Sequence, residues 1–352
     1  MPPTTPTPTP YQLPRGAERR LIEAMEPFRG LALASALQAL FATGVYDELE
    51  RGEARPAALA EALHLDEERT IAVLQFLAVE DVVAFAPAGA VGLTPHGRAY
   101  GEFRAWYAMM VGGYANVLAT LAESMAAGAS PTARRGEWVA LGSAGVDVHS
   151  SMTLIRRLVA RLPAPPRLIL DVGCGSPRYL GAICAELGCR GIGVEPDPAA
   201  FEAGRRQLEG SDGTVRIVRG SAQDCIAALD IVPDVVLTAF VLHEVLGQSG
   251  EDGVRRYLRD VFAAAPAAHL LVIEPDLRQD DPSVMRHGYA RAFYNGYYLV
   301  HPFTGQRLAP REFWEELFRS ESLTVVAGGT TDPDIDSTGL ERGWLLRAAP
   351  GQ

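Results

Sequence analysis

The chain has 352 residues, more than one hydrophobic core usually organises, so we expect two domains. Its composition, 48% hydrophobic and 21% charged, is ordinary for a globular protein and excludes wholesale disorder. The net charge of −11 argues against a nucleic-acid partner, because contacts to phosphate groups need clustered lysines and arginines.

No apolar run approaches the roughly 20 residues that span a bilayer, and residues 1–14 are rich in proline and threonine, without the apolar core of a signal peptide. We therefore expect a cytoplasmic protein with no membrane partner and a disordered tail over residues 1–14. The four cysteines form no Cys-x-x-Cys pair, so neither a disulfide framework nor a structural zinc site is indicated.

Helical spacing of apolar residues predicts a mainly helical domain over residues 15–127. Within it, two helical stretches precede two short apolar runs separated by a Pro/Gly turn; these segments are 57–63, 67–79, 82–85 and 91–94. The order helix, helix and hairpin is similar to a winged helix. Acidic residues at the start of its second helix have the wrong sign for reading DNA, so we favour a dimerisation and substrate-lid module.

Residues 128–166 are expected to be linker helices that lead to a second domain over residues 167–352. There, short buried strands alternate with amphipathic helices, which is typical of a doubly wound parallel α/β sheet. The expected strands are 168–172, 191–194, 215–219, 235–238 and 270–273, with a pair at 323–326 and 344–347 closing one edge. Ligands of such sheets bind at the carboxyl ends of the strands, so we look there for functional residues.

Three of these strand ends carry residues suited to a nucleoside. The first strand runs into Asp171-Val172-Gly173-Cys174-Gly175, whose glycines let the backbone approach a ligand closely. The second ends in Glu195-Pro196, where a carboxylate can accept both hydroxyls of a ribose. The third is followed by Ser221-Ala222-Gln223-Asp224, placed to meet an adenine edge.

These residues resemble the class I S-adenosylmethionine-dependent methyltransferases. The positions that match that family's motifs are Asp171, Gly173, Gly175, Glu195 and Asp224. The resemblance implies a Rossmann-like domain that binds S-adenosyl-L-methionine. It also places neighbours of the motifs in the cofactor site, namely Pro196, Ser221 and Gln223.

Two further features bear on this resemblance. A dinucleotide site needs a third spaced glycine to admit a pyrophosphate, but Ser176-Pro177-Arg178 stands there, which disfavours NAD. In the N-terminal half, residues 37–49, 59–63 and the turn Leu93-Thr94-Pro95-His96-Gly97 are similar to the dimerisation domain of small-molecule O-methyltransferases. That similarity implies a homodimer.

The fourth strand runs into Phe240-Val241-Leu242-His243-Glu244. In the small-molecule O-methyltransferases a histidine at this place is the general base, because a pKa near 6.5 suits removal of a hydroxyl proton. A second feature is the aromatic segment 293–302, which ends in His301-Pro302. Together the two segments resemble the α-keto acid C-methyltransferases, including those acting on phenylpyruvate and 2-ketoarginine, in which two histidines hold a metal ion.

On that resemblance His243 and His301 are the metal ligands, with His287 as an alternative to His301. Two imidazoles leave positions open on a divalent or ferric ion, and iron, zinc, cobalt and nickel all suit them. A Lewis acid on the ketone oxygen would stabilise an enolate, whose β-carbon attacks the methyl group. The product would be a β-methyl α-keto acid, the precursor of a β-methyl amino acid.

Several side chains have expected roles around this centre. Arg134 or Arg135 would bind the substrate carboxylate as a fork of donors, and we favour Arg134. Glu244 or Asp276 would accept the proton or support a ligand. Some aromatic side chains are either walls of the substrate pocket or core, namely Trp106, Phe293, Tyr294, Tyr297 and Tyr298.

Three functional hypotheses follow. The first is a metal-assisted C-methyltransferase of a small α-keto acid, with the side chain of the acid left open among arginine-like, aromatic and aliphatic groups. The second is a metal-free O-methyltransferase with His243 as general base. The third is a DNA-binding regulator without catalytic activity, which the acidic balance disfavours.

Overall fold

The structure is a computed structural model that describes residues 16–221 and 231–349. The tail expected over residues 1–14 and the expected adenine-binding residues Gln223 and Asp224 lie outside the described residues. The chain divides into two compact units after Glu102, and each unit is described by itself.

The division lies earlier than the domain boundary expected after residue 127. The reason is packing, because α6 (Arg104–Tyr107) and η1 (Ala108–Gly113) lie against helix α9 (Gly136–Ser150). Helix α9 in turn lies against α11 (Pro177–Leu187) and α12 (Pro198–Gln207), so the expected linker is part of the second unit. Helical spacing reports that a segment has an apolar face, but not which neighbour covers that face.

The first unit is mainly helical, as expected, and ends in a small antiparallel hairpin and a helix. Its elements are α1 (Ala17–Thr43), α2 (Val45–Arg51), α3 (Pro56–Ala62), α4 (Glu67–Val79), β1 (Val83–Phe85), β2 (Val91–Leu93) and α5 (Pro95–Glu102). Asp66 caps α4 by accepting a hydrogen bond from the backbone N–H of Arg69 at 2.9 Å. Gly44, at φ 82°, separates α1 from α2 in the left-handed conformation that glycine tolerates.

The second unit is built on a seven-stranded sheet in the order β5-β4-β3-β6-β7-β9-β8. Its strands are β3 (Leu168–Val172), β4 (Arg190–Glu195), β5 (Val215–Arg219), β6 (Val235–Ala239), β7 (His269–Pro275), β8 (Leu323–Thr330) and β9 (Glu341–Ala348). The first five in this order are parallel, while β9 runs antiparallel to both of its neighbours. The expected Rossmann-like α/β fold, closed by an antiparallel pair at one edge, is confirmed.

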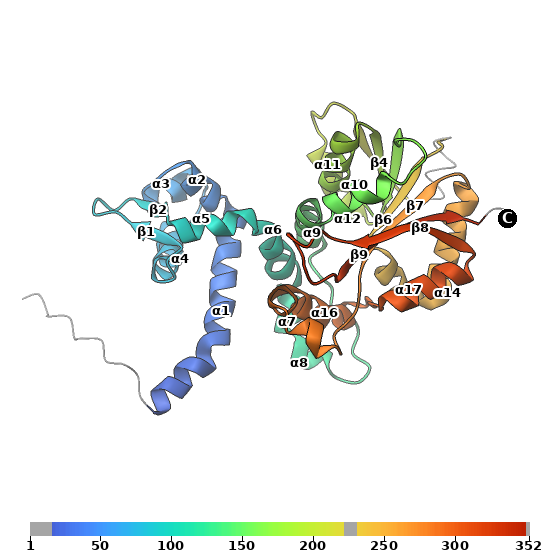
Figure 1. Cartoon of the computed structure of the whole chain (residues 1–352). Coiled ribbons are helices and arrows are strands. Elements are labelled where there is room, and N and C mark those ends of the chain that lie inside the picture. Colours follow the sequence, from blue (N-terminus) through green and yellow to red (C-terminus); the bar gives the residue numbers. More distant parts are fainter. Residues whose placement is uncertain (1–15, 222–230, 350–352) are drawn as a thin grey trace, which may run out of the picture. The chain divides into compact units, whose positions relative to one another are not determined.

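Helices cover both faces of this sheet (Figure 1). One core contains Leu258 of α14 (Leu242–Ala264) and Trp314 of α17 (Arg311–Ser320). The other contains Leu158 of α10 (Met152–Val159) and Ile183 of α11. The remaining helical elements of the unit are α6 (Arg104–Tyr107), η1 (Ala108–Gly113), α7 (Tyr114–Ala119), α8 (Leu121–Ser124), α10 (Met152–Val159), α14 (Leu242–Ala264), α15 (Pro282–Met285), η2 (Ala290–Tyr294), α16 (Asn295–Val300), η3 (His301–Thr304) and α17 (Arg311–Ser320).

The sheet has a topological switch point between β3 and β6, because β4 and β5 extend to one side and β6 and β7 to the other. The crevice at the carboxyl ends of the strands beside such a point is where doubly wound sheets bind ligands. Two π-helical turns, η1 and η2, belong to the same unit, and such turns are frequent at functional sites.

Among the described residues, no single helix is both long and apolar enough to span a membrane. Only α1 and α2 taken together meet that requirement of length and composition, and they are bent by 75°.

Two glycines of the second unit give opposite predictions when replaced by alanine. A Cβ on Gly247 of α14 would lie 2.1 Å from the carbonyl oxygen of Gly305, so Gly247→Ala should lower the free energy of unfolding by about 1–3 kcal/mol. Gly181 of α11 has open space around a Cβ, so Gly181→Ala should raise it by roughly 0.5–1 kcal/mol. Denaturant unfolding measures both, and equal effects of the two changes would contradict the packing of α14 on the Gly305 segment.

Candidate active site

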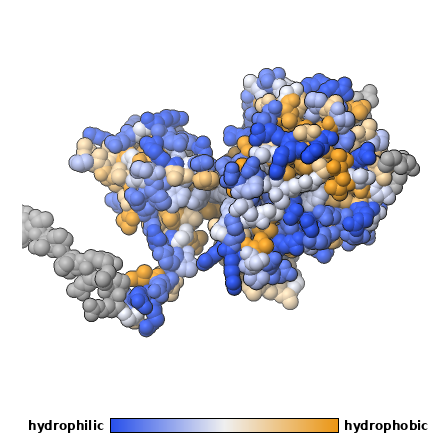
Figure 2. All heavy atoms as spheres, in the orientation of Figure 1, coloured by the Kyte–Doolittle hydropathy of each residue, from blue (hydrophilic) through white to orange (hydrophobic). Residues whose placement is uncertain are grey.

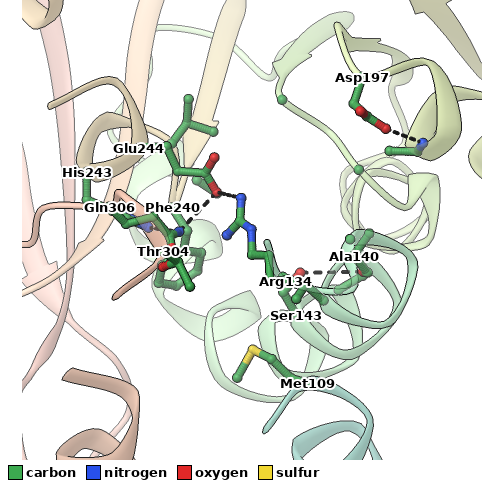
Figure 3. Close-up of a pocket in the computed structure, with 18 of the residues that line it drawn as sticks. Met109, Arg134, Ala140, Ser143, Asp197, Phe240, His243, Glu244, Thr304 and Gln306 are labelled. Carbon is green, nitrogen blue, oxygen red and sulfur yellow. Dashed lines mark hydrogen bonds and ion pairs between the residues drawn. The ribbon is translucent and has the colours of Figure 1, made fainter. Parts of the chain in front are cut away.

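A cavity of about 980 Å³ opens at the carboxyl ends of the strands, entirely within the second unit. Its walls come from the turns after β3 and β6, the end of β4, helix α9, and the η2–α16 segment. Figure 3 shows part of the lining, with Arg134, His243, Glu244 and Gln306 on one side and Asp197 on the other.

One side of the cavity is formed by the glycine turn after β3 and by Glu195, the last residue of β4. Gly173 and Gly175 adopt φ 72° and 51°, and a Cβ on Gly173 would lie 2.8 Å from Val241. Glu195 accepts hydrogen bonds from the backbone N–H groups of Gly175 and Asp197, both at 2.9 Å. These bonds hold a carboxylate at the mouth of a turn that leaves space for a ligand.

Most of the expected cofactor residues meet here. The residues that line this part of the cavity are Asp171, Gly173, Gly175, Glu195 and Pro196. Ser221 is exposed directly after β5 and is not among the lining residues. Burial and the charge of Glu195 raise the pKa of Asp171 to about 7, and burial also raises the pKa of Glu195.

The other side is organised around His243, which is 1% exposed. Phe240 follows the last residue of β6 with φ 57°. The chain then turns so that Glu274 of β7 accepts the backbone N–H groups of Leu242 at 2.7 Å and His243 at 3.3 Å. Glu274 also lies 2.7 Å from Nδ1 of His243. A carboxylate only accepts hydrogen bonds, so Nδ1 of His243 carries the hydrogen of this contact. Nε2 faces the amide nitrogen of Gln306, which is a donor, so Nε2 accepts with its lone pair.

His301 lies beside His243, with ring centroids 5.2 Å apart. Its Nδ1 donates to the carbonyl oxygen of Tyr297 at 2.5 Å, and its buried Nε2 has no hydrogen-bond partner among the described residues. Burial, followed by the neighbouring His243, lowers the pKa of His301 well below its usual value, so the ring is neutral at pH 7.

Two imidazoles that lie side by side, with their Nδ1 atoms held by hydrogen bonds, are a donor set that a transition-metal ion accepts through the Nε2 atoms. Nε2 of His243 lies 3.2 Å from the side-chain amide nitrogen of Gln306, and Nε2 of His301 has no hydrogen-bond partner among the described residues. The residues present therefore fit such an ion. Within residues 16–221 and 231–349, no group of three or more His, Cys, Asp or Glu side chains is arranged to hold a metal. Further ligands would have to come from an amide, from water or from substrate.

Glu244 and Arg134 form an ion pair at 2.6 Å next to these histidines. Gln306 donates a second hydrogen bond to the same Glu244 oxygen at 3.2 Å, and Figure 3 shows both side chains directed at it. Burial lowers the pKa of Arg134, but the charges and hydrogen bonds of Glu244 and Tyr114 together outweigh it, so the net shift is upward. Arg135 instead is exposed, pairs with Glu137 and lies over the ring of Trp138 at 5.6 Å.

Comparisons with known proteins agree with this geometry. Residues 169–262 match the model of a methyltransferase domain. Over 343 residues the chain is 39% identical to the 2-ketoarginine methyltransferase of Streptomyces arginensis, covering 96% of this chain and 98% of that protein. The chain belongs to the S-adenosylmethionine-dependent methyltransferases. It is also 31% identical over 198 residues to the indolepyruvate C-methyltransferase of Streptomyces griseus, which covers 53% of this chain and 55% of that protein.

Solved structures share the fold of this methyltransferase. Human N-acetylserotonin methyltransferase in complex with S-adenosylmethionine has a TM-score of 0.66 at 16% identity, covering 95% of this chain and 99% of that one. The mitomycin 7-O-methyltransferase MmcR has a TM-score of 0.62 at 20% identity over the same shares. The expected relation to O-methyltransferase architecture is confirmed.

Two expected alternatives lie elsewhere in the methyltransferase. His287 is exposed, and both of its ring nitrogens have partners, Ser337 at 3.0 Å and the backbone N–H of Tyr289 at 3.2 Å. Asp276 is buried in a separate cluster, where its carboxylate pairs with Arg278 at 3.0 Å and Arg342 at 3.2 Å. Neither His287 nor Asp276 lines the cavity, so the ligand role of His287 and the proton-acceptor role of Asp276 are both corrected.

The aromatic segment divides between pocket and core. Phe293, Tyr294 and Tyr297 line the cavity. Tyr298 is 1% exposed and donates its hydroxyl to the carbonyl oxygen of Asp276, so it belongs to the core. Trp106 is also a packing residue, because its indole N–H donates to the hydroxyl of Tyr289 at 3.0 Å outside the cavity lining.

Three important residues of the site were not expected from the sequence. Glu274 directly follows the expected strand 270–273, so its place at a strand end was a usable signal. Gln306 lies on a loop after the aromatic segment, and Asp147 lies in the presumed linker, where no pattern marked them. Both side chains line the cavity.

The pKa of Asp171 predicts how binding of the methyl donor depends on pH. S-adenosylmethionine carries a positive sulfonium and ammonium, which an ionised Asp171 attracts and a protonated one does not. With a pKa of about 7, the Kd for S-adenosylmethionine should fall roughly tenfold between about pH 6 and pH 8. Calorimetric titration measures this, and Asp171→Asn should flatten the dependence. An unchanged slope in that variant would assign the titration to another group.

Proposed function

We propose that this methyltransferase transfers the methyl group of S-adenosylmethionine to the β-carbon of an α-keto acid. The observation that carries the proposal is the buried pair His243 and His301, whose Nδ1 atoms are engaged by Glu274 and the Tyr297 carbonyl. Nε2 of His301 has no hydrogen-bond partner among the described residues, and Nε2 of His243 meets the side-chain amide of Gln306. The near full-length relative is named for a keto acid, 2-ketoarginine, and the second relative for C-methylation of indolepyruvate.

In this proposal the methyl donor occupies the β3–β4 side of the cavity. Its ribose hydroxyls hydrogen-bond to Glu195, which keeps lone pairs free beside the two backbone N–H groups it already accepts. The turn from Gly173 to Gly175 gives the methionine part close access to the backbone. Asp171 faces the positive charges of the donor.

His243 and His301 would hold a metal ion, with Glu274 and the Tyr297 carbonyl fixing the ring orientations. When bound, the ion supplies a Lewis acid that stabilises negative charge on the ketone oxygen of the acceptor. Arg134 binds the acceptor carboxylate with the donors of its guanidinium that Glu244 leaves free.

Glu244 is the proton acceptor in this reaction. It lies between Arg134 and Gln306, beside His243, so a carboxylate approaching Arg134 brings its β-carbon close to the Glu244 oxygens. Glu244 takes a proton from the β-carbon, and the electrons of that C–H bond form the enolate. The enolate carbon then bonds to the methyl group, while the electrons of the carbon–sulfur bond leave with sulfur as S-adenosylhomocysteine.

Metal content tests the histidine pair. Wild-type protein should contain close to one metal ion per chain, and His243→Ala and His301→Ala should both lose it, together with methylation of α-keto acids by more than about a hundredfold. His287→Ala is the matched control, because His287 is exposed outside the cavity. Elemental analysis and a methyl-transfer assay before and after chelation measure these outcomes.

A metal-free O-methyltransferase is the second candidate, favoured by the His243–Glu274 pair, since a histidine oriented by a carboxylate is suited to act as a general base. It predicts transfer to hydroxyl acceptors in the presence of chelator and tolerance of His301→Ala. That result, together with a protein free of metal, would contradict the C-methylation proposal.

We also propose a homodimer, because the first half of α1 exposes a row of apolar side chains, which Figure 2 shows as orange spheres near the start of this helix. These side chains are between 46% and 65% exposed and comprise Leu21, Ile22, Met25, Phe28 and Leu31. Exposed apolar rows of this kind mark protein interfaces.

Light scattering tests the dimer. Wild type should have a mass of about twice 37.8 kDa, and Phe28→Asp combined with Leu31→Asp should give a monomer. Glu23→Ala on the same helix is the control and should stay dimeric. A monomeric wild type would contradict this assignment.

A further inference from the structure

We propose that the acceptor carries a cationic side chain of the guanidinium type, which binds to the carboxylate of Asp147 at the end of the cavity remote from Arg134. This inference rests on the proposed keto acid function and deepens it by naming the side chain of the substrate.

Asp147 of α9 is a buried acid that lacks a partner. It is 7% exposed and lines the cavity, and no hydrogen bond or ion pair to its carboxylate comes from the described residues. Its charged neighbours are two further acids, Glu341 and Asp171, which together with burial raise its pKa well above the usual value. A buried carboxylate in such surroundings is costly unless a cation compensates it.

Glu341 shows the contrast. It is also buried, but it accepts hydrogen bonds from the hydroxyls of Ser150 at 2.8 Å, Ser151 at 2.7 Å and Thr331 at 2.6 Å. These three donors satisfy Glu341 inside the protein. Asp147, one helical turn before Ser150 and Ser151, has no such donors and presents its carboxylate to the cavity.

The cavity lining carries a positive charge, Arg134, near the start of α9 and a negative one, Asp147, farther along this helix. Arg134 lies just before the helix begins at Gly136 and reaches Glu244, whereas Asp147 lies eleven residues into the helix, roughly 16 Å along its axis. A ligand with a carboxylate at one end and a cation at the other matches this arrangement. Phe293 and Tyr297 supply aromatic walls, on which a planar guanidinium stacks favourably.

The cation could instead belong to the methyl donor, but the surroundings of Asp147 favour the acceptor. Of its two acidic neighbours, Glu341 exerts the stronger influence and Asp171 the weaker. Glu341 lies on β9, beyond β7, whereas the proposed ribose ligand Glu195 lies on β4, on the opposite side of β3. Asp147 therefore belongs to the acceptor side of the cavity.

An unpaired acid also rejects the wrong substrate. A keto acid with a neutral or apolar side chain would leave the Asp147 carboxyl group buried without a partner, whereas a cationic side chain pairs with it in its ionised form. Leaving a buried polar group of the site unpaired is the condition that gives an active site its strongest discrimination. Asp147 is thus a specificity-determining residue in this proposal.

The test compares wild type and Asp147→Asn on the α-keto acids derived from arginine, from citrulline, its neutral urea isostere, and from norleucine. Wild type should prefer the arginine-derived acid by roughly ten- to a hundredfold in kcat/KM. In the variant this preference should vanish because the KM for the arginine-derived acid rises. The kcat of the variant and its Kd for S-adenosylmethionine should stay within about twofold of the wild-type values.

Other outcomes separate the failures. If wild type methylates neutral keto acids as well as the cationic one, this inference fails while the proposed function stands. If it methylates no keto acid, the proposed function fails. If Asp147→Asn weakens S-adenosylmethionine binding and slows all acceptors equally, Asp147 serves the methyl donor and the inference is overturned.

Stability provides a second readout. Asp147→Asn should leave Tm unchanged or higher, because it removes an uncompensated buried acid. Asp234→Asn is the control, since Asp234 accepts the backbone N–H groups of Arg167 at 2.8 Å and Leu168 at 3.0 Å, and its loss should lower Tm. A fall in Tm for Asp147→Asn comparable to that of Asp234→Asn would assign Asp147 a structural role.

Discussion

The buried carboxylate of Glu274 is the group on which the reacting side of the site depends. It is fully buried at the end of β7 and receives the backbone N–H groups of Leu242 and His243 and the Nδ1 of His243. These contacts fix the turn from β6 into α14, the orientation of the imidazole and its tautomer at once. His243 in turn accepts the backbone N–H of Arg307 at 3.0 Å through its carbonyl oxygen, which connects the Gln306 loop to the same centre.

The charges of the cavity explain how two unlike ligands can share it. Acids surround the proposed position of the donor, and S-adenosylmethionine is positively charged, so an ionised Asp171 would favour it. The proposed anionic acceptor needs a cation in this acidic environment, and Arg134 would supply it next to Glu244. Because Glu244 is held by both Arg134 and Gln306, binding of the acceptor and placement of the proton acceptor are coupled in the proposed mechanism.

The sheet could be predicted from the sequence because its central strands, such as β3, β6 and β7, are short runs of buried β-branched and aliphatic residues, which is a local signal. The glycine turn and Glu195 followed from their places at strand ends. The pairing of His243 with His301 came only from the family resemblance, since contacts between distant segments leave no mark in spacing. Asp276 was a plausible acid after a strand, yet the nearby arginines hold it outside the cavity.

The atom that receives the methyl group distinguishes C-methylation from O-methylation, and isotope labelling identifies that atom directly. The enzyme is incubated with S-adenosylmethionine labelled with carbon-13 in its methyl group and with α-keto acids derived from arginine, phenylalanine and leucine, and the products are analysed by NMR. If the proposed C-methylation is right, the labelled carbon is bonded to the β-carbon of one of these acids. Label found on an oxygen, or label transferred to hydroxyl acceptors and to no keto acid, would contradict it.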